Sequence, residues 1–118
     1  MSDESTRFRE PSPQERRLLK ALAGRWSSSL RDWVGRVKVR PMTDGGMGSL
    51  LLLLPESAAE SRRFGGSVAE LHFKDDDGVD VIASLNVDQN KVPFELDVWK
   101  TDFSSLIRVP DAFEAGSQ

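Results

Sequence analysis

The chain has 118 residues, enough for one domain with a hydrophobic core and too few for two domains of ordinary size. It contains no cysteine and a single histidine, which excludes disulfide frameworks and thiolate metal sites and leaves zinc short of ligands. The longest apolar run, residues 50–54, is far shorter than a membrane span, and residues 1–4 carry neither region of a signal peptide. We therefore expect a cytoplasmic protein with no membrane segment, metal or cofactor.

The net charge of −3 is unevenly distributed along the sequence. Residues 1–63 contain 12 lysines and arginines against 8 acidic residues, whereas residues 64–118 contain 4 against 11. A basic helical half that packs beside an acidic sheet accounts for this split. The alternative is a nucleic-acid patch formed by Arg16, Arg17, Lys20, Arg36, Lys38 and Arg40. No recognition motif accompanies these residues, so we favour the first interpretation.

One helix start stands out near the N-terminus. After a polar stretch at residues 1–11, which we expect to be flexible, residues 12–15 read Ser-Pro-Gln-Glu: a serine cap, a proline at the first helical position and the glutamate of a capping box. The apolar spacing predicts a helix over residues 13–23 that ends at a left-handed Gly24. A second, shorter helix is predicted over residues 29–34.

Two strands and a glycine-rich turn follow in the sequence. Residues 36–40 alternate between charged residues and valine, which predicts a first strand. Residues 50–54 are five leucines, which predict a short strand covered on both faces. The turn between them contains residues that tolerate positive φ: Asp44, Gly45, Gly46 and Gly48. A phosphate cradle is the alternative, but the lysine and following helix of a P-loop are missing, so we predict a structural turn.

Two further turns predict the register of the last three strands. Residues 76–78 suit a three-residue hairpin loop with Gly78 in the left-handed position. This loop pairs Phe73 with Val81, Leu71 with Ala83, Lys74 with Asp80 and Glu70 with Ser84. Residues 89–90 suit a two-residue turn, which pairs Val87 with Val92, Leu85 with Phe94, Ala83 with Leu96 and Val81 with Val98. Both registers place apolar residues opposite apolar residues.

The candidate site lies on the outer face of this predicted sheet. The register gives three outer rows: Glu70, Ser84 and Glu95; His72, Ile82 and Asp97; Lys74, Asp80 and Trp99. The candidate binding residues in these rows are His72, Asp80, Glu95, Asp97 and Trp99. A tryptophan on a polar sheet face usually has something packed on it, either from its own chain or from a partner. This arrangement predicts a non-enzymatic protein-interaction surface with a polar rim.

A small hydrolase or a small-molecule-binding domain is the enzymatic alternative. It would use Glu95 and Asp97 as acid and base, together with His72. Such chemistry needs burial and a cleft to separate the two pKa values, whereas a solvated sheet face provides neither. His72 and Asp97 also stand two strands apart, about 10 Å at the backbone. We therefore predict no catalytic residues.

Four short blocks resemble the signature of an uncharacterised family of small bacterial domains: DGGMGSL at 44–50, RFG at 63–65, DGV at 77–79 and ELDVWKTDF at 95–103. The resemblance covers the chain from the first helix to Pro110. It implies a small bacterial cytosolic domain without assigned chemistry, and some members are similar in size and style to immunity proteins of bacterial toxin systems. The leucine run departs from the polar alternation expected of that family.

The sequence thus predicts a single α+β domain over residues 12–110, followed by a flexible tail at residues 111–118. Its antiparallel sheet of about five strands in meander order carries the N-terminal helices on one face. Another protein is the favoured partner, nucleic acid the less favoured one, and the oligomeric state is open.

Overall fold

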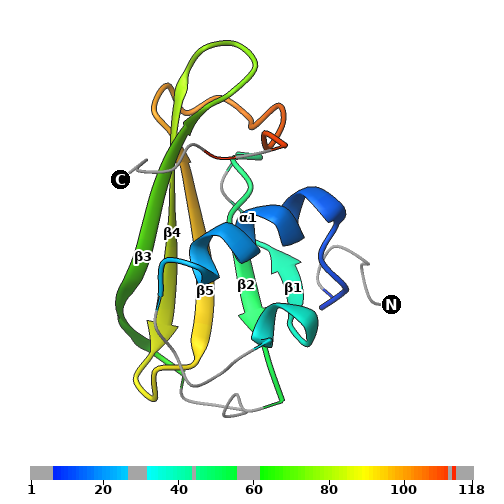
Figure 1. The fold of residues 1–118 in the computed structure, drawn as a ribbon, viewed down its shortest axis with the longest axis vertical. Coiled ribbons are helices and arrows are strands. Elements are labelled where there is room, and N and C mark those ends of the chain that lie inside the picture. The colour runs from blue at the N-terminus through cyan, green and yellow to red at the C-terminus, as the bar shows by residue number, and fades with distance from the viewer. Residues whose placement is uncertain (1–6, 27–31, 44, 56–61, 112, 114–118) are drawn as a thin grey trace.

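The computed structural model describes residues 7–26, 32–43, 45–55, 62–111 and 113. Its elements are the helix α1 (Pro13–Ala23), the 3-10 helix η2 (Trp33–Gly35) and the strands β1 (Lys38–Pro41), β2 (Leu50–Leu53), β3 (Phe64–Lys74), β4 (Asp80–Asp88) and β5 (Pro93–Lys100). The strands form one antiparallel sheet, and α1 crosses one of its faces (Figure 1). Within the described ranges, neither helix has the length and apolar character needed to cross a membrane.

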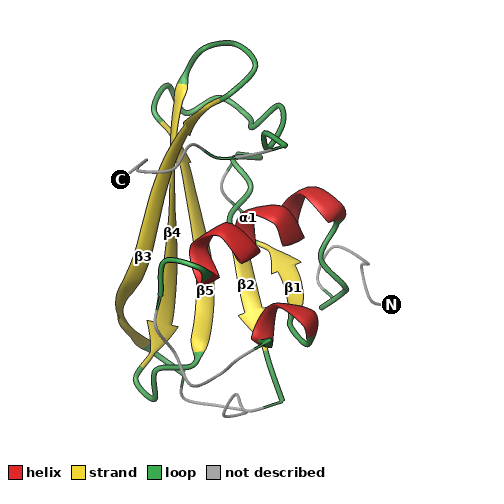
Figure 2. Ribbon diagram, in the orientation of Figure 1, coloured by secondary structure: helices red, strands yellow, loops and turns green. Residues whose placement is uncertain are grey.

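The five-stranded antiparallel sheet confirms that part of the predicted fold, but the meander order is wrong. The strand order is β1-β2-β5-β4-β3, so the chain leaves β2, starts again at the far edge and returns with β5 beside β2 (Figure 2). A physical reason lies in the side chains of β2. Leu50 and Leu52 are buried on one face and Leu51 and Leu53 are half-buried on the other, so β2 is stabilised by strands on both sides.

Helix α1 starts and ends at the predicted residues. The Ser12 hydroxyl accepts a hydrogen bond from the backbone N–H of Glu15 (3.1 Å), and the Glu15 carboxylate accepts one from the N–H of Ser12 (2.8 Å). The predicted left-handed end is wrong, because Gly24 has a φ of −67° and its N–H still bonds to the carbonyl of Lys20 (3.0 Å). The helix packs on the sheet through the buried residues Leu18, Leu19 and Leu22.

The second predicted helix is much reduced. Part of its range, residues 29–31, lies outside the described residues, and the rest forms only the three-residue η2. Trp33 and Val34 are both buried there and join the hydrophobic core. One regular helix therefore covers the sheet within the described part of the chain.

The hairpin between β3 and β4 confirms its predicted register. Phe73 lies opposite Val81, and the loop closes with a hydrogen bond from the N–H of Asp75 to the carbonyl of Val79 (3.0 Å). Gly78 has a φ of +82°, the left-handed conformation that the loop requires. Of the inner side chains of this hairpin, Leu71, Val81 and Ala83 are fully buried and Phe73 is half-buried.

The predicted register between β4 and β5 is wrong by two residues, although the faces are right. Leu85 lies opposite Leu96 instead of Phe94. The loop has one more residue than predicted because Lys91 takes a φ of +63°, and the N–H of Asp88 then bonds to the carbonyl of Val92 (2.9 Å). A register shift next to Asn86 adds the second residue. Two one-residue shifts restore the alternation, so Leu96 still points into the core.

Candidate functional site

The outer rows of the sheet differ from the predicted rows because of this shift. Trp99 lies opposite Ile82, which in turn lies opposite His72, so these three residues form one row. Asp97 belongs instead to the row of Glu70 and Ser84. The aromatic candidate and the histidine are therefore in line across three strands, with an isoleucine between them.

Trp99 forms an exposed aromatic pair with Phe103. Their ring centroids lie 6.2 Å apart with the ring planes tilted by 47°, and 43% of Trp99 and 69% of Phe103 are exposed. The residues after β5, 101–107, predict a turn or short helical segment anchored by Phe103, Leu106 and Ile107. For Phe103 that prediction is wrong, because the residue is exposed. Phe103 has a φ of +65°, a conformation unfavourable for a bulky residue, and this backbone conformation accompanies a ring exposed to solvent.

Hydrogen bonds made by Phe103 and by the residues just before and after it fix the turn that carries this residue. The N–H of Phe103 bonds to the carbonyl of Lys100 (2.8 Å), and the N–H of Thr101 bonds to the carbonyl of Asp80 (3.0 Å). The Asp102 carboxylate accepts the N–H (3.0 Å) and the hydroxyl (2.6 Å) of Ser104. These two bonds from Ser104 lower the pKa of Asp102. The turn therefore has its own network and does not depend on burial of Phe103.

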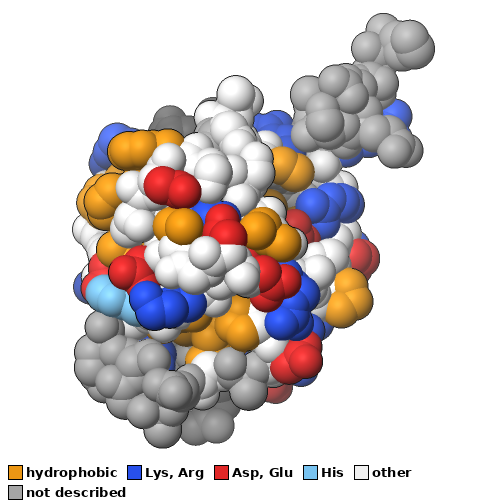
Figure 3. Space-filling view, turned by 90° about the horizontal axis from the view of Figure 1, so that it is seen from above, with side chains coloured by type: hydrophobic (Ala, Val, Ile, Leu, Met, Phe, Trp, Pro, Cys, Tyr) orange, Lys and Arg blue, Asp and Glu red, His pale blue; other side chains and the backbone are white. Residues whose placement is uncertain are grey.

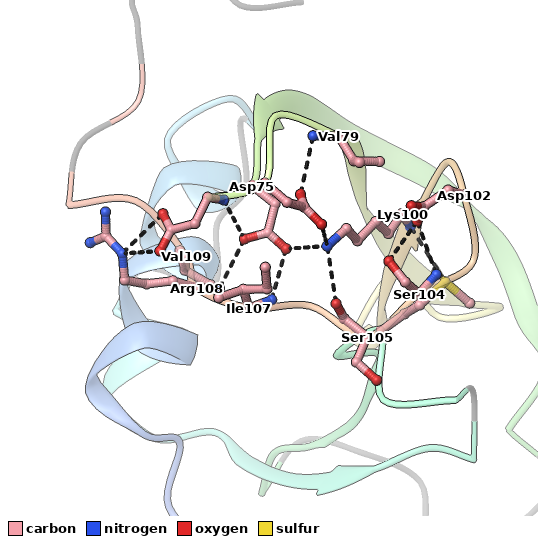
Figure 4. Close-up of polar contacts among 12 residues, drawn as sticks. Asp75, Val79, Lys100, Asp102, Ser104, Ser105, Ile107, Arg108 and Val109 are labelled. Carbon is pink, nitrogen blue, oxygen red and sulfur yellow. Dashed lines mark hydrogen bonds and ion pairs between the residues drawn. The ribbon is translucent and has the colours of Figure 1, made fainter.

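Beneath this turn, a buried lysine joins three parts of the chain. The Lys100 ammonium donates to Asp75 (2.8 Å), to Asp77 (2.7 Å) and to the carbonyl of Ser105 (3.1 Å), and its side chain is fully buried (Figure 4). Burial lowers the pKa of Lys100, but the hydrogen bonds and charges of the two aspartates outweigh it and raise the pKa. Lys100 therefore stays an ammonium and is not available as a nucleophile.

Asp75 is the centre of this network. Its carboxylate also accepts the backbone N–H groups of Ile107 (2.7 Å), Arg108 (3.0 Å) and Asp76 (2.7 Å). Burial raises the pKa of Asp75, yet the hydrogen bonds from Lys100 and these N–H groups lower it to about 2. The ion pair between Asp75 and Lys100, with these hydrogen bonds, fixes the segment after β5 against the β3–β4 loop. Sequence reasoning missed it, although strand alternation places residue 100 on the inner face after Leu96 and Val98.

The other predicted site residues have separate partners instead of a shared site. The shortest contacts are His72 to Glu70 (3.3 Å), Asp80 to Lys74 (2.6 Å), Glu95 to Asn86 (3.4 Å) and Asp97 to the Ser49 hydroxyl (3.5 Å). The proposed hydrolytic set, Glu95, Asp97 and His72, therefore does not converge. Among the residues that the structure describes, no cluster of three or more His, Asp or Glu side chains is placed to hold a metal ion.

A pocket of about 250 Å³ lies on the covered side of the sheet, away from these residues. Its lining includes the start of α1, the glycine-rich turn and the segment after β5, with Glu15, Gly46, Leu96 and Val109 among the residues. None of the three candidate hydrolytic residues contributes to it. The pocket therefore gives no support to the enzymatic alternative.

The glycine-rich turn receives the segment after β5. The carbonyl of Gly46 accepts the N–H of Leu106 (3.0 Å), and the carbonyl of Gly45 accepts the Ser105 hydroxyl (3.0 Å). Gly46 has a φ of +82°, a conformation that favours glycine, and a Cβ there would lie 2.8 Å from the Ser105 hydroxyl oxygen. These contacts agree with a structural turn, while Asp44 lies outside the described residues.

Most of the basic residues considered for nucleic-acid binding contact groups of the same chain. Arg16 bonds to the carbonyl of Val34 (2.7 Å), and Arg17 bonds to the carbonyls of Val109 and Pro110 (2.8 Å each). Further contacts join Lys38 to Glu10 and stack Arg40 on Phe8. In the view from above, basic side chains are interspersed with acidic and hydrophobic ones (Figure 3). These arginines and lysines fix the helix, the N-terminal segment and the segment after β5.

We therefore expect only weak binding to a nonspecific DNA duplex, with a Kd on the order of 100 μM or weaker at physiological salt. Fluorescence anisotropy with a labelled duplex at two salt concentrations measures this affinity. A micromolar complex that weakens steeply with added salt would contradict the expectation and favour the nucleic-acid alternative.

Comparison with known proteins places the chain in one family. Residues 8–110 match the family described as "Domain of unknown function (DUF6984)". No curated protein and no solved structure matches the chain significantly. The match includes strand β5 and the turn after it, which carry the aromatic pair, as well as the buried Lys100 network and helix α1. The chain therefore belongs to the DUF6984 family of domains of unknown function.

Proposed function

We propose that this domain is a non-enzymatic protein-interaction module that binds its partner through Trp99 and Phe103. The observation that carries the proposal is the conformation of Phe103, which exposes 69% of the residue at a φ of +65° beside Trp99. A left-handed backbone at such a residue costs about 1 to 3 kcal/mol. Burial of the Phe103 ring does not offset this cost in the free domain, whereas burial against a partner would.

The surroundings of the pair support the same role. Tryptophan is enriched among the residues that dominate binding energy at interfaces, where polar groups surround it. Trp99 has Ile82 beside it as further apolar surface and Asp97 and Asp102 as polar neighbours. The turn is fixed by its own hydrogen bonds, so little conformational entropy is lost when the rings are buried. The resemblance to small bacterial domains adds a bacterial cytoplasmic setting and, by analogy, an immunity-protein role to the proposal.

A photo-cross-linking amino acid at residue 103 tests the proposal in cells of the native host. We expect it to capture one protein reproducibly, and we expect the capture to disappear when Trp99→Ala is added. With the captured protein purified, Trp99→Ala should weaken its affinity by about 30-fold or more, which corresponds to the loss of about 2 kcal/mol at a dominant interface residue.

Phe64 is the matched control for both measurements. It is 61% exposed, similar to Phe103, but lies at the start of β3 and away from the aromatic pair. A cross-linker at residue 64 should not capture the same protein, and Phe64→Ala should change its affinity by less than about twofold. Capture from both positions, or an unchanged affinity in Trp99→Ala, would contradict the proposal. Turnover of a substrate that is lost in a folded Asp97→Asn variant would replace it with the enzymatic alternative.

A further inference from the structure

The two edges of the sheet differ in whether a further segment of the chain pairs with them. At the β1 edge, Arg9 pairs with Val39 through two backbone hydrogen bonds (2.8 and 2.7 Å), and β1 ends in Pro41. At the other edge lies β3, the longest strand, and within the described part of the chain no segment pairs with its outer side. An unpaired strand presents a row of N–H and C=O groups to which another strand can bind.

Only the second half of β3 is regular enough to pair with another strand. Register shifts interrupt the first half, between Phe64 and Gly66 and between Ser67 and Ala69. From Glu70 to Lys74 the strand continues without interruption, with no proline. Irregularities of this kind commonly prevent edge strands from pairing with another chain. The first half of β3 is therefore protected against such pairing, and the regular second half is not.

The side chains of this regular half are complementary to a second copy of themselves. Two antiparallel copies related by a two-fold axis at His72 place Glu70 opposite Lys74 of the second copy, and Lys74 opposite its Glu70. Unlike charges opposite each other stabilise antiparallel pairs. On the inner face, the same register places Leu71, which its own chain already buries, opposite the half-buried Phe73 of the second copy, so no charged residue lies opposite an apolar one.

Other registers satisfy the charges less well. A two-fold axis between two residues would place each inner-face residue of one copy opposite an outer-face residue of the other. Directly opposite residues must point to the same face of the sheet, so the axis must pass through a residue. An axis at Glu70 or at Lys74 would place like charges directly opposite each other, which is unfavourable. In the free chain, the Lys74 ammonium already contacts the carboxylate of Asp80 on the adjacent strand β4 (2.6 Å). With the axis at His72, the lysine lies between two carboxylates, Asp80 and Glu70 of the second copy.

We propose that two copies of this chain associate through the Glu70–Lys74 halves of β3, antiparallel and with the two-fold axis at His72. The product is one continuous ten-stranded sheet. This surface is separate from the Trp99 and Phe103 surface, so either proposal can fail without the other. In the dimer the row from His72 to Trp99 continues through the axis, and the two tryptophans lie on one face about 24 Å apart, five strand spacings of 4.8 Å.

Cysteine cross-linking tests the register, because the chain has no cysteine of its own. His72→Cys faces itself across the axis, at the distance of directly opposite residues, where a disulfide can form. Glu70→Cys is the control, because the two introduced cysteines would lie four residues apart along the strands, about 13 Å. Under mild oxidation we expect a linked dimer from His72→Cys and none from Glu70→Cys, while a mixture of Glu70→Cys and Lys74→Cys chains should link.

Charge reversal tests the same register without a covalent bond. Sedimentation equilibrium over a concentration series should show the unmodified chain approaching twice its monomer mass. Lys74→Glu places like charges opposite each other twice in the dimer and should weaken association by about tenfold. The double variant Glu70→Lys with Lys74→Glu restores unlike pairs and should recover the affinity to within about threefold. Thermal unfolding of each dilute monomer verifies that the fold is kept.

Three results would overturn the proposal. The first is equal cross-linking of Glu70→Cys and His72→Cys, which indicates random collision. The second is a chain that stays monomeric at the highest concentration and gives no His72→Cys cross-link, as expected if a strand of a different protein occupies this edge. The third is a double charge variant that associates no better than Lys74→Glu.

Discussion

Replacement of Asp75 by asparagine is expected to lower the free energy of unfolding by about 3 to 5 kcal/mol, because it leaves the buried Lys100 ammonium without its only fully buried counter-charge among the described residues. The amide also cannot accept all of the hydrogen bonds that the carboxylate receives from Lys100, Ile107 and Arg108. Urea denaturation at pH 7 measures the loss. Asp76→Asn is the matched control: its neighbouring carboxylate is half-exposed and contacts Arg108 at 3.3 Å, so its loss should cost at most about 1 kcal/mol.

The pH dependence of stability provides a second measurement of the same change. The pKa of Asp75 in the folded chain is about 2, below the ordinary value near 4 of the unfolded chain. Such a group stabilises the fold fully above pH 4, and this contribution disappears as the pH falls from about 4 to 2. The difference in stability between the unmodified chain and Asp75→Asn should therefore shrink over that range. A constant difference would contradict the ionic role of Asp75.

The second large effect is expected for Leu96→Ala, which should lower the free energy of unfolding by about 2 to 5 kcal/mol. Leu96 is 1% exposed and lies between Leu85 on β4 and Leu50 on β2, so its truncation leaves a cavity in the middle of the sheet. Urea denaturation again measures the change. Glu95→Ala, one residue earlier on the outer face, should cost little, and equal midpoints for the two variants would show that the faces of β5 are reversed.

Local chemistry in the sequence was enough to predict several elements correctly. The Ser12 and Glu15 capping box marked the start of α1, and the glycine at position 78 marked the β3–β4 loop. Strand alternation placed Leu96 inside and Trp99 outside, and both placements are correct. Each of these depends on residues a few positions apart, whose geometry is determined by the backbone period or by one turn.

The errors concern features that depend on distant residues or on unusual backbone angles. A lysine with positive φ at position 91 and a shift at Asn86 moved the register of β5, and neither has a strong signal in the residue types. The position of β5 beside β2 depends on which strands bury the leucine run most completely, which local spacing does not reveal. Phe103 was misplaced for a related reason: an aromatic residue in a short apolar segment usually packs inward, and here a left-handed turn exposes it.

The strand order also has a kinetic consequence. The β1–β2 hairpin and the β3–β4–β5 meander are each built from neighbouring segments, whereas Leu50–Leu96 and Leu51–Glu95 are the residue pairs that join them in the sheet. Forming that junction closes a long loop, whose entropic cost must be met before the contacts stabilise it. We therefore expect the β1–β2 hairpin and the β3–β4–β5 meander to form first and to dock late in folding. Substitutions at the β2–β5 junction should act mainly on the rate of unfolding. Substitutions within the β1–β2 hairpin or the β3–β4–β5 meander should act mainly on the rate of folding.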